Sequence, residues 1–180
     1  DPGDDGRSAS TYTPTCKVIV GVLPEPCSRH NTPSRATSLP RLLKGASARK
    51  DCGVLLVLTD AEHALAAACG LARSLPTYSA TTRNGEHTVT AALLGPGGPV
   101  ADTDRLRAAA AGVRLAAHLV DSPPNELTTS AFVDRARGVA SSLDGVSIEV
   151  IQGKDLLERG YGGLWGVGKA SEHPPALVVL

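Results

Sequence analysis

Apolar and polar residues recur along this chain with two periods, one typical of strands and one typical of helices. Residues 17–23 (KVIVGVL) are rich in β-branched side chains and predict a strand. Residues 53–59 (GVLLVLT) are continuously apolar, which predicts a strand covered on both faces of a parallel or mixed sheet. Asp60 then stands at an N-cap position, and residues 61–75 carry apolar side chains at helical spacing. A strand followed directly by a helix favours an α/β fold.

The middle of the chain adds a turn signal and the longest helical pattern. Residues 78–94 are a hairpin candidate, because Asn84-Gly85 between two alternating segments suits a tight turn. The glycine- and proline-rich residues 95–99 break the chain again. Residues 102–120 predict a long helix whose length suits a connector between two domains. Residues 38–43 predict a short helix. Pro40 must lie in its first turn, because proline is tolerated there and not in the interior of a helix.

The last third of the chain repeats the α/β alternation. Thr128 or Thr129 is expected to cap a helix with apolar positions from Phe132 onward. A strand over residues 146–151, a short helix over 154–159 ending at Gly160, a glycine loop and a strand over 176–180 complete the prediction. We expect residues 1–15 to form a flexible tail, residues 16–118 an N-terminal α/β domain, and residues 119–180 the beginning of a second domain.

Composition narrows the class of partner. Eighteen basic residues balance eighteen acidic ones, and aromatic residues make up only 3% of the chain. This argues against nucleic-acid binding by bulk charge or base stacking, and against binding to a charged membrane surface. No apolar stretch approaches the roughly 20 residues that a membrane-spanning helix needs. We therefore expect neither a nucleic-acid partner nor a membrane partner.

The cysteines favour a reducing, cytoplasmic compartment. The four cysteines are widely spaced and form no C-x-x-C pair, so we expect free thiols at Cys16, Cys27, Cys52 and Cys69.

The chain begins at Asp1, contains no methionine and ends in an apolar run, which leads us to expect a piece of a longer protein.

Candidate chemistry is sparse along the sequence. The segment from Gly163 to Ala170 approaches the phosphate loop G-x-x-x-x-G-K-[ST], but it lacks the preceding strand and the final hydroxyl. A tight loop that packs Trp165 against a neighbouring element is the better interpretation. Cys27 and His30, with Cys16 or Cys52, match no zinc-ligand spacing.

The remaining titratable residues are dispersed. No pair of serine and histidine stands out as a nucleophile and base. The single histidines are expected to be solvated or locally bonded: they are His63, His87, His118 and His173. The single carboxylates are expected to cap helices or face solvent: they are Asp121, Glu126, Asp134, Asp144, Glu149, Asp155 and Glu158.

Four segments in order carry a resemblance to a known family. They are LVDSPPNELTTSAF, the V-x-I-E-V strand, D-L-L-E-R-G-Y-G-G-L, and V-G-K-A-S-E-H-P-P-A-L-V-V-L, all within residues 119–180. In these motifs the chain resembles the leucyl aminopeptidase (cytosol aminopeptidase, M17-type metallopeptidase) family, and within it the branch described as probable aminopeptidases. The N-terminal part is similar to the family more loosely.

The resemblance implies a fold and an activity. It implies a macro-like mixed sheet flanked by helices, a long linker helix, and then the truncated start of an α/β metallopeptidase catalytic domain. It also implies a hexameric, cytoplasmic exopeptidase. Such an enzyme releases N-terminal amino acids from peptides with the help of two divalent metals, zinc or manganese.

The family's metal-binding lysine lies in a V-G-K-G segment followed by D-x-G-G, and Lys169 stands in a different segment with Ala170 after it. We therefore expect no catalytic, cofactor-binding or metal-ligating residue in this chain, and no activity of the chain alone. The alternative is a macro-like ligand-binding, regulatory or assembly module without catalysis.

Overall fold

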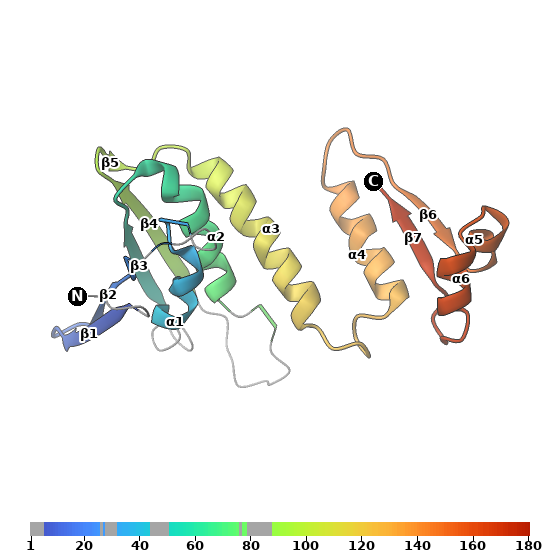
Figure 1. Cartoon of the computed structure of the whole chain (residues 1–180), viewed down its shortest axis with the longest axis horizontal. Coiled ribbons are helices and arrows are strands. Elements are labelled where there is room, and N and C mark those ends of the chain that lie inside the picture. Colours follow the sequence, from blue (N-terminus) through green and yellow to red (C-terminus); the bar gives the residue numbers. More distant parts are fainter. Residues whose placement is uncertain (1–5, 26, 28–31, 44–50, 76, 79–87) are drawn as a thin grey trace. The chain divides into compact units, whose positions relative to one another are not determined.

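The chain folds into two compact units, residues 1–121 and 122–180, in a computed structural model (Figure 1). The structure describes residues 6–25, 27, 32–43, 51–75, 77–78 and 88–180. The boundary lies three residues beyond the expected end of the first domain at residue 118. Each unit mixes helices and strands, so the chain is α/β throughout.

The first unit opens with an antiparallel strand pair. β1 (Arg7–Tyr12) pairs with β2 (Lys17–Val22), with Arg7 opposite Val22 and Tyr12 opposite Lys17. The Thr13 hydroxyl donates to the Cys16 carbonyl at 3.0 Å and stabilises the turn between the strands. We expected a flexible tail over residues 1–15, whereas β1 is a paired strand. Its small and polar side chains carry no strand signal, and its order depends on the partner strand.

A three-stranded sheet forms the centre of the first unit. β3 (Cys52–Val57) runs parallel to β4 (Val89–Gly95), and β5 (Gly98–Pro99) adds a short antiparallel pairing to the end of β4. Parallel neighbours require a crossover, which here contains η2 (Ala61–His63) and α2 (Ala64–Ser74). The hairpin predicted over residues 78–94 falls largely outside the described residues, but its second segment is β4.

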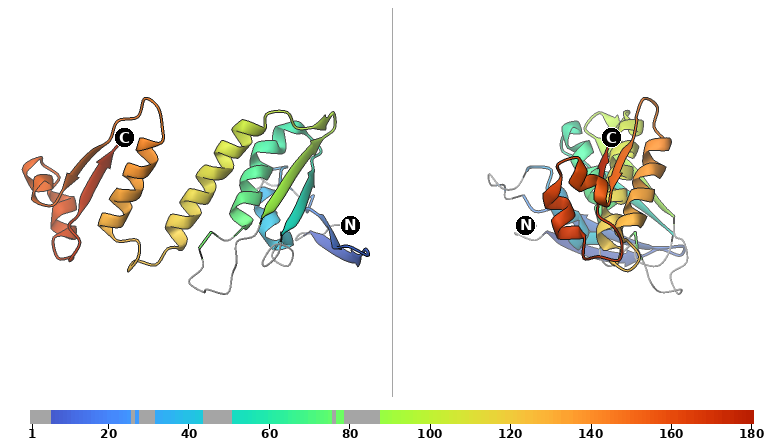
Figure 2. Two further views of the ribbon diagram at one scale, coloured as in Figure 1. Left: turned by 180° about the vertical axis from the view of Figure 1, so that it is seen from behind. Right: turned by 90° about the vertical axis from the view of Figure 1, so that its right-hand side faces the viewer.

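Helices cover one face of this sheet, as Figures 1 and 2 show. α2 packs beside α3 (Thr103–Asp121), and η1 (Ala36–Ser38) and α1 (Leu39–Leu43) pack against α2. The core cluster joins Ala64, Ala68 and Leu106, with Leu58, Leu93 and Val100 packed against it. The helices thus lie where the predicted patterns put them.

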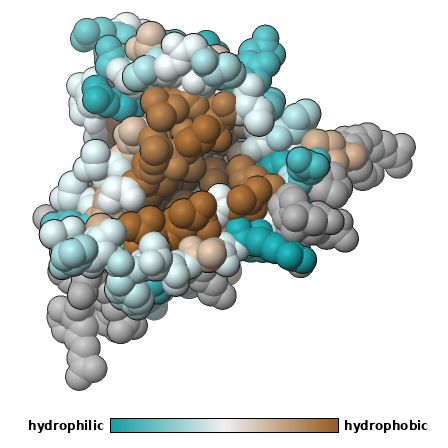
Figure 3. Space-filling view, turned by 90° about the vertical axis from the view of Figure 1, so that its left-hand side faces the viewer, coloured by the Kyte–Doolittle hydropathy of each residue, from teal (hydrophilic) through white to brown (hydrophobic). Residues whose placement is uncertain are grey.

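The opposite face of the sheet is open within the described part of the chain. Leu55 is 59% exposed and Val57 is 75% exposed, whereas their neighbours Val54 and Leu56 are half-buried. Within the described residues, the expectation that residues 53–59 are covered on both faces is therefore wrong. Figure 3 shows a gathering of hydrophobic residues on this side of the molecule.

The second unit is a helix packed on a two-stranded sheet. α4 (Thr129–Ser141) contacts β7 (Ala176–Val179), which pairs antiparallel with β6 (Glu149–Gln152). α5 (Lys154–Glu158) and α6 (Gly162–Gly168) lie between the two strands in sequence. The buried apolar side chains of this unit come from α4, β6 and α5: they are Val133, Ala140, Ile151 and Leu156.

The glycine-rich segment after Gly160 corrects a prediction. We expected a loop there, but residues from Gly162 to Gly168 form α6. The Trp165 amide donates to the Tyr161 carbonyl at 3.1 Å, and the Lys169 amide donates to the Trp165 carbonyl at 2.9 Å. Glycine is a poor helix former, and no residue of α6 is buried, although α5 contacts the helix and Pro175 lies close to Gly168. Trp165 is half-buried in this helix.

Candidate functional site

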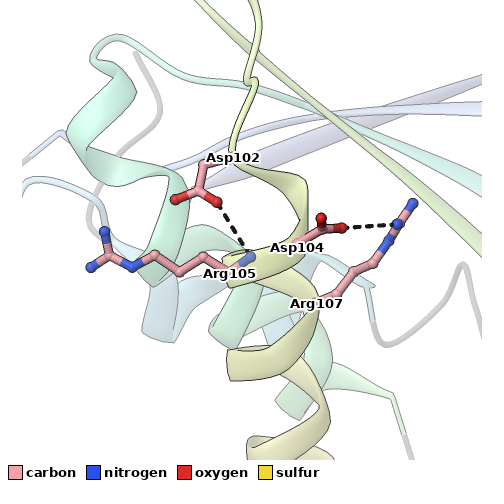
Figure 4. Close-up of polar contacts among 4 residues, drawn as sticks. All are labelled: Asp102, Asp104, Arg105 and Arg107. Carbon is pink, nitrogen blue, oxygen red and sulfur yellow. Dashed lines mark hydrogen bonds and ion pairs between the residues drawn. The ribbon is translucent and has the colours of Figure 1, made fainter.

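The polar residues at the start of α3 serve the helix itself (Figure 4). The Arg105 amide donates to the Asp102 carboxylate at 3.3 Å, which satisfies one free amide of the first turn. The Arg107 guanidinium pairs with the Asp104 carboxylate at 3.5 Å, one helical turn away. Both partners are highly exposed, so the pair adds little stability. Asp102 therefore caps the helix.

One ion pair links two elements of the second unit. The Arg159 guanidinium, just after α5, donates a hydrogen bond to the Glu149 carboxylate on β6. That hydrogen bond, together with the charge of Glu149, raises the pKa of Arg159 above its usual value. Both side chains are more than half exposed, so the pair positions α5 on β6 without forming a buried reactive group. The other carboxylates predicted to be single, from Asp121 to Glu158, are also exposed.

Lys169 and the preceding glycines do not form a phosphate loop. Lys169 is the C-cap of α6, and its side chain is exposed. A phosphate loop places its glycines before a helix, so that amides at the helix N-terminus face the anion. Here Gly163, Gly166 and Gly168 lie inside the helix. The segment therefore lacks the geometry of a phosphate loop, and the absence of nucleotide binding stays a prediction.

The histidines and cysteines do not converge in the described part of the chain. Cys16 and Cys27 are exposed and Cys52 and Cys69 are half-buried, all as free thiols. His118 lies on α3, where its Nδ1 is 3.3 Å from the Thr77 carbonyl. His63 lies in η2 and His173 in the turn before β7, whereas His30 and His87 lie outside the described residues.

The described residues supply too few neighbouring donors for a metal centre. Among the described residues, no three side chains of histidine, cysteine, aspartate or glutamate come together. A catalytic metal site needs about three protein ligands around each ion. The described donor set therefore does not fit zinc or manganese, and no catalytic step can be built on these side chains. That the whole chain carries no metal ligand stays a prediction.

The structure also contains a cavity that no pattern in the sequence indicated. It lies in the first unit between α2, β4 and α3, and its volume is about 220 Å³. Its wall is largely apolar, with Leu71, Ala72, Leu93, Leu106 and Ala110 among the lining residues. Arg107 and Arg114 of α3 also line it. Alanines and leucines at helical spacing predict a packed core. The space between these side chains is therefore seen only in the folded structure.

Comparison with known proteins identifies the class of protein. Residues 6–84 match the family model described as M17 aminopeptidase N-terminal domain 2. Residues 114–180 match the model described as the cytosol aminopeptidase family catalytic domain. The chain belongs to the M17 leucyl aminopeptidase family.

Individual relatives agree with this assignment. The human probable aminopeptidase NPEPL1 is 38% identical over 172 residues, which cover 91% of this chain and 33% of that protein. Leucine aminopeptidase 1 of Caenorhabditis elegans is 35% identical over 161 residues, covering 88% of this chain and 33% of that protein. The chain thus spans about a third of the length of the curated relatives it matches.

Solved structures show the same fold. The C. elegans leucine aminopeptidase LAP1 matches with a TM-score of 0.76 and 32% identity, over 87% of this chain and 32% of that one. Leucyl aminopeptidase from Trypanosoma brucei in complex with actinonin matches with a TM-score of 0.79 and 31% identity, over 96% of this chain and 36% of that one.

None of the helices in the described residues has the length and hydropathy of a membrane span.

Proposed function

We propose that this chain supplies the N-terminal domain and the opening of the catalytic domain of a metal-dependent aminopeptidase. The observation that carries the proposal is the match to two M17 family models in succession along one chain. The substrates would be peptides, from which the complete enzyme removes N-terminal amino acids in the cytoplasm. The neutral net charge agrees with a small peptide substrate rather than a nucleic acid.

Two divalent ions, zinc or manganese, would supply the chemistry of the complete enzyme, since a pair of metals can polarise a carbonyl and activate water. We propose that their ligands are not among the residues of this chain. The described side chains support this, because they form no suitable donor cluster. A hexameric assembly is part of the same proposal and follows from the family resemblance.

A chimeric enzyme tests the family function directly. This chain would replace the matched segment of the C. elegans leucine aminopeptidase, and hydrolysis of leucine p-nitroanilide would be measured with added Mn²⁺ or Zn²⁺. We expect a folded, oligomeric and active chimera. A chimera that folds and assembles but shows no hydrolysis in either metal would contradict the assignment of these two domains.

The isolated chain provides the complementary test. We expect no leucine release from the same substrate, and no tight stoichiometric binding of Zn²⁺ or Mn²⁺ by calorimetry. Release of leucine by the purified chain alone, or tight binding of two ions, would show that the chain contains the metal centre.

A second candidate function is a ligand-binding module in the first unit. The cavity between α2, β4 and α3 favours it, because ligand sites are commonly concave and mostly apolar. A nucleotide-like ligand is one form of this function, which the macro-like sheet implied by the family resemblance suggests. Calorimetry with ADP-ribose tests that form, and the absence of both heat and thermal shift would remove it.

A further inference from the structure

We propose that the cavity of the first unit binds a small organic anion with an apolar body. This inference goes beyond the proposed function, and its test does not depend on that function. We call it the α2–α3 cavity, defined by Leu71 and Ala72 of α2, Leu93 of β4, and Leu106 and Ala110 of α3.

The wall of the α2–α3 cavity selects for an apolar body. Leu71, Ala72 and Leu106 are each less than 10% exposed, so the base of the cavity is fixed by packing of the two helices on the sheet. The volume of about 220 Å³ lies below the roughly 300–1,000 Å³ of sites for drug-sized ligands. One short aliphatic chain or one branched side chain suits this space better than a nucleotide.

The charge of the lining residues selects for an anion. Arg107 and Arg114 stand seven residues apart on α3, which places them two turns apart on one side of the helix. None of the residues that line the cavity is acidic. A carboxylate at the Arg114 end of the cavity would therefore meet a cation and no acidic lining residue, whereas an ammonium group would be repelled.

Arg114 is the stronger anchor of the two arginines. Arg107 is already shared with Asp104, although that pair is exposed and weak. Arg114 makes no hydrogen bond or ion pair within the described part of the chain. Its guanidinium offers two parallel donors that match the two oxygens of a carboxylate. The ligand class is thus an aliphatic carboxylate, either a free one or the carboxyl end of a peptide with an apolar last residue.

Calorimetry of the 180-residue chain with two probes separates these sources. Octanoate represents the free carboxylate, and N-acetyl-leucine represents the carboxyl end of a peptide. We expect saturable one-to-one binding of at least one of them, weaker binding of octanol, and none of octylammonium. The probe that binds identifies the source. Absence of saturable binding for both anions overturns the proposal, as does equal affinity for octanoate and octanol.

Paired variants on α3 locate the binding. Ala110→Phe fills the cavity and is expected to abolish saturable binding, whereas Ala108→Phe places the same ring at an exposed position that does not line it. Arg114→Ala is expected to weaken binding about fivefold, as for one exposed ion pair, whereas Arg105→Ala should not. Thermal melting checks that each variant is folded. Equal behaviour of Ala108→Phe and Ala110→Phe, both folded, places binding elsewhere and overturns the proposal.

Discussion

At the scale of single residues, two glycines of α6 have opposite roles. A Cβ atom on Gly168 would lie 2.4 Å from the Pro175 Cβ, which is closer than real Cβ contacts. A Cβ atom on Gly166, half a turn earlier, would meet nothing within 4 Å. Gly168 is therefore required by the approach of α6 to the segment before β7, whereas Gly166 only lowers helix propensity.

Substitution of these two glycines should move stability in opposite directions. Gly168→Ala is expected to lower the free energy of unfolding by about 1–3 kcal/mol, because the packed proline must shift. Gly166→Ala is expected to raise it by about 0.5–1 kcal/mol, because alanine is the better helix former. Urea unfolding followed by the fluorescence of Trp165, the single tryptophan, reports on this unit. A stability change of the same sign in both variants would contradict the packing described here.

At the scale of elements, α4 begins at a side-chain cap and β3 separates two environments. The Thr128 hydroxyl accepts a hydrogen bond from the Ala131 amide at 3.3 Å, so Thr128, and not Thr129, is the N-cap that the sequence left open. On β3, residues alternate between the helix-covered face and the open face, because side chains alternate along a strand.

Loss of the α4 cap should destabilise the second unit. Thr128→Ala removes the acceptor for one unsatisfied amide of the first turn and is expected to lower the free energy of unfolding by about 1 kcal/mol. Thr129→Ala is the matched control, since Thr129 lies inside the helix and alanine suits that position. Both are measured by urea unfolding with Trp165 fluorescence. Equal losses for the two variants would argue against Thr128 as the cap.

The two faces of β3 should differ in their tolerance of a polar residue. Leu55→Thr, on the open face, is expected to change the free energy of unfolding by less than about 0.5 kcal/mol. Leu56→Thr, toward the helices, is expected to lower it by about 1–2 kcal/mol because apolar burial is lost. Urea unfolding followed by far-ultraviolet circular dichroism measures both. A larger loss for Leu55→Thr would mean that the open face is covered in solution.

At the scale of the whole molecule, the two units differ in how much apolar surface they bury. Among the described residues of the first unit, most buried apolar side chains come from α1, α2 and α3: they are Leu39, Ala64, Ala67, Ala68, Leu71, Ala72, Leu106 and Ala117, and Pro24 after β2 is buried as well. The second unit has fewer of them and only a two-stranded sheet, an arrangement that depends on helix packing for its stability.

Hydrogen exchange should therefore be uneven along the chain. We expect the amides of β3, α2 and α3 to exchange most slowly, and those of residues 122–180 to exchange faster, because local opening of the smaller core costs less free energy. Exchange of the 180-residue chain, followed by mass spectrometry of peptides, measures this. Equal protection in both units would contradict the expected difference in stability.

The sequence by itself determined most of the elements and the family. β-branched and continuously apolar runs predicted β2 and β3, helical spacing predicted α2 and α3, and ordered motifs over residues 119–180 indicated an M17 aminopeptidase. These signals are local, because strand and helix periods and capping residues act over a few positions.

Only the tertiary structure decided the features that depend on distant partners. The pairing of β1 with β2, the open face of β3 and the space between α2 and α3 all depend on what packs against them. A short-range pattern carries no information about that partner, since packing joins residues far apart in the chain. The sequence therefore determined which segments form, whereas the assembled fold decided which surfaces they bury and where a ligand has room.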